Sequence, residues 1–289
     1  MTNTTRIDHI VDGIYRIPTF SPEFGITFNQ FLIDDEQPAL IHTGTYEHYA
    51  GVRSAIAEVL DPTRLAHIVL LHWEGDENGG MDRFMAQASE SQLVGSALSI
   101  MLNASGFGLH ARTQGFMDGQ TLGLGAHRLR FLETPHVHHW DSMMVVEETT
   151  NSLFPSDLYL QPGDQPPVSG ENLTAEMLEV YRGVGIFAHE NPVRAVADRI
   201  EQLAPDWIHA MQCATITGAA LHYYTTALRE HEFAYRGLLV GREISQPAKA
   251  CAHTPSVITT EAVVTGEPLA HARCASGRSC SDGTGHARP

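Results

Sequence analysis

The sequence predicts a layered α/β sandwich. Short apolar or alternating segments that are typical of strands recur along the chain, segments with helical spacing lie between them, and polar residues gather where the predicted strands end. The chain has 289 residues, of which 43% are hydrophobic. This is enough for one sizeable core.

The first half of the chain alternates predicted strands and helices. Residues 67–71, His-Ile-Val-Leu-Leu, are typical of a short buried strand. This strand leads into a polar, glycine-rich loop over residues 72–80. The other predicted elements of this half are a strand and turn over 9–17, strands over 28–33, 38–42, 92–94, 121–124 and 127–133, and helices over 49–60, 81–88 and 96–103.

The second half continues this pattern and then changes in composition. Its predicted elements are strands over 143–147, 152–155 and 207–211, and helices over 171–183, 190–203 and 219–233. From about residue 245, Ser, Thr, Ala, Gly and Pro dominate and the periodicity fades. We therefore predict one folded domain over residues 1–244 and a flexible tail over residues 245–289.

Charge and hydropathy exclude some partners. A formal net charge of −16 argues against a nucleic-acid backbone or an anionic membrane surface as the main partner. The first residues lack the pattern of a signal peptide, and no apolar run reaches the roughly 18 residues that a membrane span needs. We expect a soluble, cytoplasmic protein, and a homodimer is left open.

The strongest local motif follows the predicted strand over 67–71. It reads His72-x-Glu74-x-Asp76-Glu77. Alternate residues of an extended segment point the same way, so His72, Glu74 and Asp76 can converge on one point. One imidazole and several carboxylates suit iron or manganese better than zinc. The alternative is a solvated acidic loop.

A second cluster favours metal binding over that alternative. His136, His138 and His139 follow another predicted strand, and Asp157 stands at the end of the strand over 152–155. A carboxylate that arrives separately can bridge two cations and offset their mutual repulsion. Each of these residues taken singly is more often structural than functional.

The order and spacing of these residues resemble those of the metallo-β-lactamase superfamily, in the branch of flavodiiron and oxygen-binding diiron proteins. That branch has His-x-Glu-x-Asp, a His about sixty residues later and an Asp about eighteen residues after that. Here sixty-one residues separate Asp76 from His138, and eighteen separate His138 from Asp157. The likeness covers roughly residues 8–235. It implies a four-layer αββα sandwich with the site at strand-end loops between the two sheets.

The resemblance also implies a site with two iron ions. His72, Glu74 and His138 would bind the first iron, Asp157 would bridge, and Asp76 would bind the second. The chain departs from the branch at three positions: His42 stands where an Asp is common, Glu77 where a His is usual, and Gln212 where a final His is expected. We include Glu77 and Gln212 among the predicted ligands as oxygen donors. The spare histidines that could complete the second iron are His42, His136, His139, His209 and His222.

The implied activity is an O2-dependent diiron monooxygenase, similar to the diiron monooxygenases of natural-product biosynthesis. Its substrate would be a hydrophobic small molecule, such as a diterpenoid intermediate, carried as a coenzyme A or carrier thioester. Electrons would come from a separate ferredoxin or reductase. The aromatic and apolar residues that predict a pocket beside the site are Trp73, Phe107, Trp140, Tyr159 and Met81.

Two other activities compete with hydroxylation. A binuclear hydrolase would activate a water for attack on an ester or thioester, but Glu74 and Glu77 replace two His that such enzymes usually carry. A protein that binds or reduces O2 or NO is the other alternative.

Overall fold

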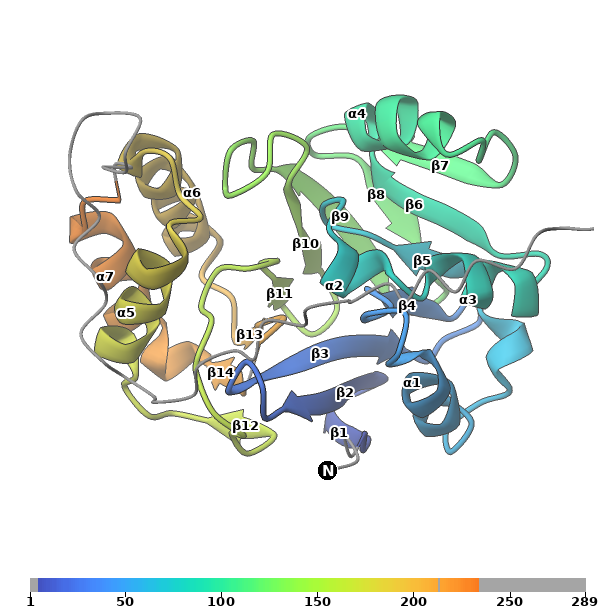
Figure 1. Ribbon diagram of the computed structural model, residues 1–289, viewed down its shortest axis with the longest axis horizontal. Helices are drawn as coiled ribbons and strands as arrows, with labels where there is room; N and C mark the ends of the chain where they lie inside the picture. Colours follow the sequence, from blue (N-terminus) through green and yellow to red (C-terminus); the bar gives the residue numbers. More distant parts are fainter. Residues whose placement is uncertain (1–4, 213, 234–289) are drawn as a thin grey trace, which may run out of the picture. The chain divides into compact units, whose positions relative to one another are not determined.

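Two seven-stranded sheets pack face to face, and helices cover their outer faces (Figure 1). The computed structural model describes residues 5–212 and 214–233. The first sheet has the order β1-β2-β3-β4-β5-β6-β7. Its strands are β1 (Asp8–Val11), β2 (Ile14–Ser21), β3 (Ile26–Ile33), β4 (Ala39–Ile41), β5 (His67–Val69), β6 (Gln92–Ser96) and β7 (Thr113–Phe116).

The second sheet has the order β12-β14-β13-β11-β10-β9-β8. Its strands are β8 (Thr121–Gly123), β9 (Arg128–Glu133), β10 (Met143–Glu147), β11 (Ser152–Phe154), β12 (Val168–Ser169), β13 (Trp207–His209) and β14 (Thr215–Thr217). The α-helices are α1 (Tyr49–Ile56), α2 (Gly75–Asn78), α3 (Met81–Gln87), α4 (Ala97–Ser99), α5 (Thr174–Val184), α6 (Glu190–Leu203) and α7 (Leu221–Glu230). Shorter turns of helix are η1 (Pro62–Arg64), η2 (Ile100–Ala104, a π-helix) and η3 (Gly218–Ala220).

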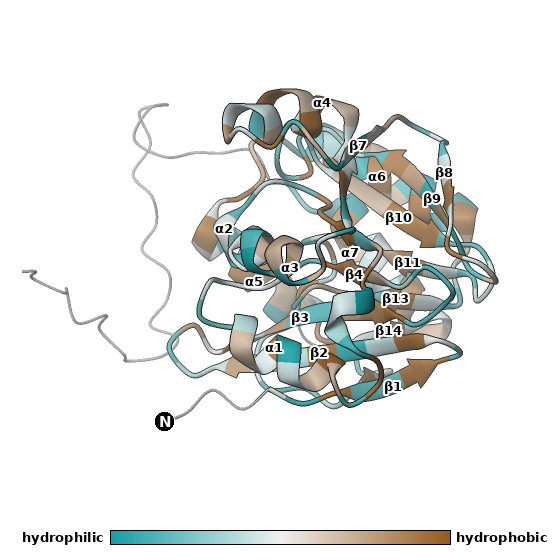
Figure 2. Ribbon diagram, turned by 90° about the vertical axis from the view of Figure 1, so that its right-hand side faces the viewer, coloured by the Kyte–Doolittle hydropathy of each residue, from teal (hydrophilic) through white to brown (hydrophobic). Residues whose placement is uncertain are grey.

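Three hydrophobic clusters separate the four layers. In β3, Phe31 and Ile33 belong to the cluster between the sheets, whereas Leu32 faces the opposite way into the cluster under α1 and α3. The third cluster packs α5, α6 and α7 against the outer face of the second sheet. Figure 2 shows the hydrophobic residues along the strands of this layered core. The predicted αββα sandwich is confirmed.

The structure differs from the predicted elements where the sequence signal is short. The strand and turn expected over 9–17 correspond to β1, a turn at Gly13, whose φ of +66° suits glycine, and the first half of β2, which continues to Ser21. The strands β7, β12 and β14 were not predicted, because each has only two to four residues and no clear alternation. No helix among the described residues could span a membrane. The predicted tail over 245–289 lies outside the described residues.

His209, on β13, is part of the core between the sheets. Its ring lies 5.2 Å from the ring of Phe31 and 4.7 Å from that of Phe154, and its Nδ1 shares a hydrogen bond of 3.1 Å with Thr215 Oγ1. Burial lowers the pKa of His209 to about 3. His209 is therefore neutral in the folded protein at every pH above that value.

We expect His209 to make the stability of the protein depend on pH. Below pH 6.5 the unfolded chain takes up a proton at His209 and the folded protein does not, so stability falls as the pH falls toward about 3. One such proton changes the free energy of unfolding by at most about 1.4 kcal/mol per pH unit. The free energy of unfolding can be measured with urea at about pH 6.5 and 5.5 for the full chain and for His209→Gln. It should fall less between these two pH values in the variant than in the unmodified protein. Equal losses in both proteins would contradict this expectation.

Candidate metal centre

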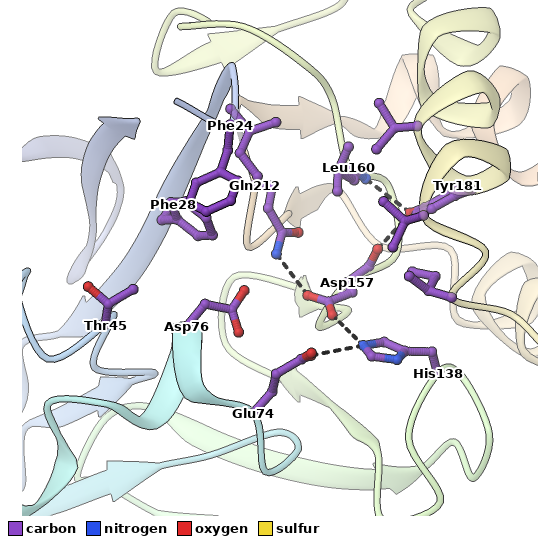
Figure 3. A pocket seen from close by; sticks show the side chains of 14 residues that line it. Phe24, Phe28, Thr45, Glu74, Asp76, His138, Asp157, Leu160, Tyr181 and Gln212 are labelled. Atoms are coloured by element: carbon purple, nitrogen blue, oxygen red, sulfur yellow. Dashed lines mark hydrogen bonds and ion pairs between the residues drawn. The ribbon is translucent and has the colours of Figure 1, made fainter. Parts of the chain in front are cut away.

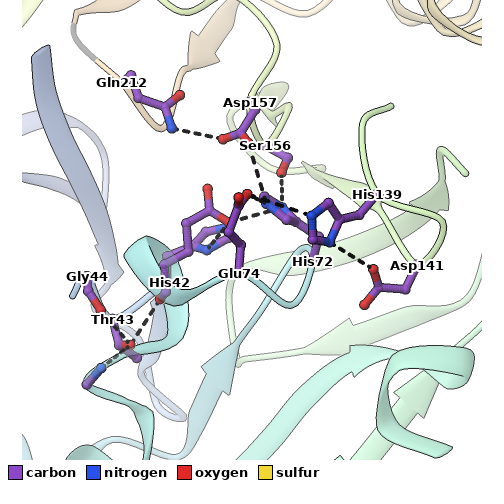
Figure 4. A network of polar contacts seen from close by, with 12 residues as sticks. His42, Thr43, Gly44, His72, Glu74, His139, Asp141, Ser156, Asp157 and Gln212 are labelled. Atoms are coloured by element: carbon purple, nitrogen blue, oxygen red, sulfur yellow. Dashed lines mark hydrogen bonds and ion pairs between the residues drawn. The ribbon is translucent and has the colours of Figure 1, made fainter. Parts of the chain in front are cut away.

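His72 lies at the centre of the site, directly after β5, and its side chain is fully buried. Its Nδ1 atom lies 2.7 Å from Ser156 Oγ and 3.0 Å from Glu77 Oε2. Its Nε2 atom lies 3.0 Å from Glu74 Oε2 (Figure 4). The two ring nitrogens therefore have different neighbours, and Nε2 is the one that faces the other predicted ligands.

Four of the predicted ligands converge. His72, Glu74, His138 and Asp157 each offer one nitrogen or oxygen atom, and these four atoms lie within 4.8 Å of one another. His138 comes from the loop between β9 and β10, and its Nε2 lies 2.8 Å from Asp157 Oδ2 and 3.1 Å from Glu74 Oε2. Two imidazoles and two carboxylates at this spacing form a donor set that fits a metal ion.

Asp157, which follows β11, faces two sides of the site with its two oxygens (Figure 3). Its Oδ2 atom contacts His138, whereas its Oδ1 atom accepts a hydrogen bond of 2.9 Å from Gln212 Nε2. Asp76 lines the same cavity as Asp157 and Gln212. This geometry is compatible with a carboxylate that bridges two metal positions.

Glu77 contacts two of the four converging groups, His72 on its Nδ1 side and Asp157. Its carboxylate is buried, and Oε2 lies 3.1 Å from His42 Nδ1 and 3.0 Å from His72 Nδ1. His42 comes directly after β4, and β4 is the strand that pairs with β5. Two of the departures noted in the sequence, His42 and Glu77, thus contact each other behind His72.

The backbone fixes this contact between the two loops. Thr43 donates from its backbone N–H to Glu77 O at 2.7 Å, and its hydroxyl donates to the same oxygen at 3.0 Å. The hydroxyl also accepts a hydrogen bond from the backbone N–H of Gly80 at 3.1 Å. A Cβ on Gly79 would lie 2.5 Å from Tyr46 N, so the close approach of the loops requires glycine there.

The electrostatics of the site fit a cation. Hydrogen bonds from His138 and His72 lower the pKa of Glu74 to about 2. Burial raises the pKa of Asp76 to about 8, and neighbouring carboxylates add to the rise. Burial disfavours a charge on His138, but hydrogen bonds to Asp157 and Glu74 outweigh it and raise its pKa to about 9. Three carboxylates, those of Glu74, Asp76 and Asp157, thus lie beside the imidazoles of His72 and His138, and a bound divalent cation would favour the charged form of all three.

Two buried oxygens give a second reason to consider a metal. Asp76 Oδ1 and Gln212 Oε1 are buried and accept no hydrogen bond from the described residues. Oxygen atoms in this situation carry a desolvation cost that a bound cation or an ordered water would offset. The residues on the Asp76 side of Asp157 thus fit a second metal position.

The spare histidines lie at different distances from the centre. His139 is nearest, with Nε2 4.0 Å from Glu74 Oε2. His42 contacts Glu77, and His209 faces the core between the sheets. His136 and His222 are exposed.

An apolar cavity of about 300 Å³ adjoins the carboxylates (Figure 3). Its walls come from the β2–β3 hairpin, from Leu160, and from α5 and the segment that follows it. None of the five residues expected to form an apolar pocket lines this cavity: Trp73 stacks on Phe107, Tyr159 and Met81 belong to hydrophobic clusters, and Trp140 is exposed. Apart from Leu160, which follows Asp157 by three residues, the apolar walls are far from the motifs in sequence, and no local pattern marks them.

The chain was compared with known families, curated proteins and solved structures. The sequence pattern of the family described as "ODP family beta lactamase" matches residues 26–211, which is more than half of the chain. The chain belongs to this family. The match includes six of the seven predicted ligands and ends one residue before Gln212.

Curated relatives of this ODP-family chain include flavodiiron-type reductases. The chain is 29% identical over 176 residues to the rubredoxin-oxygen oxidoreductase of Megalodesulfovibrio gigas, covering 57% of the chain and 42% of the relative. It is 28% identical over 166 residues to the nitric oxide reductase of Moorella thermoacetica, covering 53% of the chain and 41% of the relative. The chain thus spans less than half the length of these relatives. Their names do not extend the likeness to natural-product hydroxylases or to hydrolases.

Solved structures of the same fold agree with the layered architecture. The rubredoxin oxygen:oxidoreductase of Desulfovibrio gigas superposes with a TM-score of 0.70 at 22% identity, covering 78% of this chain and 61% of that one. A 1–254 fragment of the diflavin flavoprotein A 5 of Nostoc superposes with a TM-score of 0.69 at 15% identity, covering 79% of this chain and 98% of the fragment. At these identities the likeness shows the fold alone.

Proposed function

We propose that this ODP-family protein is a diiron oxidoreductase that reduces O2 or NO with electrons from a separate electron-transfer protein. The observation that carries the proposal is the convergence of His72, Glu74, His138 and Asp157 within 4.8 Å. The names of the relatives support the choice of O2 and NO as substrates. The donor set supports iron, because it combines imidazole with hard carboxylate oxygens.

The proposed ligands divide between two positions. His72, Glu74 and His138 would hold the first iron, Asp76 would hold the second, and Asp157 would serve both. Bound iron would supply the open coordination positions and the electron transfer that reduction of a diatomic gas requires. Burial around Asp157 limits the access of water to the bridging carboxylate.

Two further residues orient these ligands in the proposal. Glu77 and Ser156 both contact Nδ1 of His72, and this contact leaves Nε2 to present its lone pair to the metal. We propose this orienting role for Glu77 in place of direct ligation. Gln212 donates to Asp157 Oδ1 and so fixes the plane of the bridging carboxylate.

The overall reactions are O2 + 4 e⁻ + 4 H⁺ → 2 H2O and 2 NO + 2 e⁻ + 2 H⁺ → N2O + H2O, with the electrons from the external donor. The test is to load the full chain with iron, reduce it without oxygen, and add O2 or NO in separate reactions. We expect the iron-loaded protein to consume at least one of the two gases and the metal-free protein to consume neither. Consumption of neither gas by the iron-loaded protein would contradict the proposal.

Hydroxylation of an apolar molecule is the second candidate. The cavity beside the carboxylates is the observation that favours it, since neither O2 nor NO needs such a space. The balanced reaction is R–H + O2 + 2 e⁻ + 2 H⁺ → R–OH + H2O, with the same external electron donor. Product analysis with an organic molecule present separates this reaction from simple reduction of the gas.

Replacing Gln212 by histidine should tighten binding at the second metal position. Gln212 is buried beside Asp157, and an imidazole nitrogen is a stronger ligand for a divalent ion than an amide oxygen. Titration of the metal-free full chain with Fe²⁺ should give a second binding step that is tighter in Gln212→His than in the unmodified protein. Gln212→Leu is the control, and it should not tighten this step. An unchanged second step in Gln212→His would place residue 212 outside the ligand shell.

A further inference from the structure

We infer that the cavity beside the metal centre binds a neutral, largely apolar organic molecule. The inference goes beyond the proposed reduction of O2 or NO. It rests on the size of the cavity, on the composition of its walls and on the position of its mouth.

Size excludes a diatomic gas as the ligand that shapes this space. The cavity has a volume of about 300 Å³. One water molecule occupies about 30 Å³ of the liquid, and diatomic gases are of similar size. Pockets for organic ligands begin at roughly 300 Å³. The cavity therefore reaches the size of a pocket for a small organic molecule, although part of it lies between the proposed metal ligands.

The walls define the chemistry of this ligand. Phe28 on β3 and Leu160 are buried wall residues, and α5 contributes Val180 and Tyr181. The Tyr181 hydroxyl already donates to Asp157 O at 2.6 Å and accepts from Leu160 N at 3.2 Å. The ring of Tyr181 is thus held in place by the backbone, and it adds apolar surface to a wall that is formed before any ligand binds.

Charge restricts the ligand further. No lysine or arginine lies among the described residues that line the cavity, and its polar end carries the carboxylates of Glu74, Asp76 and Asp157. His138 is the one basic side chain among the described lining residues, and its Nε2 already contacts Glu74 and Asp157, so it is not free to pair with an anionic group on the ligand. A neutral molecule is therefore favoured, and the coenzyme A thioester expected from the sequence has no partner in the cavity for its phosphates.

The mouth of the cavity is apolar as well. Phe24, at the turn between β2 and β3, is 66% exposed, and Val184, at the end of α5, is 67% exposed. Both line the cavity. An apolar rim around an apolar interior suits a ligand that enters from solvent and buries most of its surface.

The test uses two fluorescent probes with the same aromatic skeleton. N-phenyl-1-naphthylamine is neutral, and 1-anilinonaphthalene-8-sulfonate carries a negative charge. We expect the neutral probe to bind the iron-loaded full chain at one site, at least tenfold more tightly than the charged probe. Equal affinities, or no saturable binding of the neutral probe, would overturn the inference.

Three variants locate the bound probe. Val184→Asp places a charge at the mouth and Val180→Trp fills the interior, so both should weaken binding of the neutral probe at least tenfold. Leu102→Asp is the matched control, because Leu102 is 54% exposed on a different apolar surface, on η2. Binding that is weakened by Leu102→Asp and unchanged in both cavity variants would overturn the inference.

The same samples separate this inference from the proposed function. Circular dichroism confirms that each variant folds, and iron analysis reports the metal centre independently of the probe. Full iron content without binding of the neutral probe would overturn only the cavity inference. Binding of the neutral probe to a protein that cannot hold iron would support the cavity and contradict the diiron proposal.

Discussion

Replacing Asp157 by asparagine is expected to lower the iron content from two ions per chain to one or none. Asp157 Oδ2 contacts His138, and Oδ1 faces Gln212 on the other side. An asparagine keeps the shape but offers only one oxygen and no charge, so it cannot offset the repulsion between two cations. We expect the rate of O2 or NO consumption to fall roughly 100-fold or more. Iron analysis and gas consumption of the full chain measure the two effects.

Asp141→Asn is the matched control for this substitution. Asp141 is also buried, and it accepts a hydrogen bond of 3.2 Å from Asn103 Nδ2. It does not belong to the four converging groups. Its asparagine variant should keep the full iron content. Retention of both irons by Asp157→Asn would show that the bridging assignment is wrong.

Replacing Glu77 by glutamine is expected to weaken iron binding about 10- to 100-fold, although Glu77 is not a proposed ligand. The substitution removes the charge that lies 3.0 Å from His72 Nδ1 and 3.1 Å from His42 Nδ1. His72 then loses the partner that favours a lone pair on Nε2. Competition with a chelator of known affinity measures the change. Glu77→Ala should weaken binding further, because glutamine still offers an oxygen to His72.

A second buried Glu–His pair provides the control for Glu77. Glu147 Oε1 lies 3.1 Å from His127 Nδ1, and both side chains are buried away from the metal centre. Glu147→Gln should lower the free energy of unfolding and leave the affinity for iron unchanged. If Glu77→Gln changes only stability, as Glu147→Gln should, the orienting role of Glu77 is wrong.

The sequence was sufficient to predict the layers and to name the four residues that the structure brings together, His72, Glu74, His138 and Asp157. Apolar segments such as 28–33 and 67–71 indicate strands, and a motif placed at the end of a strand keeps its geometry when the strand forms. The contact between His42 and Glu77 could not be predicted in the same way. It depends on the parallel pairing of β4 with β5 and on the hydrogen bonds of Thr43, which join segments far apart in sequence.

The cavity shows the same limit of sequence reasoning. Trp73 lies within the His72–Glu77 motif and Phe107 follows it in sequence, but the two rings stack on each other outside the cavity. Apart from Leu160, most of its apolar walls come from the β2–β3 hairpin and from α5, which only the folded chain brings to the metal centre. Proximity in sequence to a ligand therefore predicted apolar character beside the site but assigned it to the wrong residues.

We propose that this chain holds two iron ions among His72, Glu74, Asp76, His138 and Asp157. The most direct measurement is metal analysis of the full chain purified without chelators, combined with Mössbauer spectroscopy of the reduced protein before and after exposure to O2. The proposal predicts close to two irons per chain and a spectrum that changes when O2 is added. Two zinc ions per chain, or iron whose spectrum does not respond to O2 or NO, would contradict it.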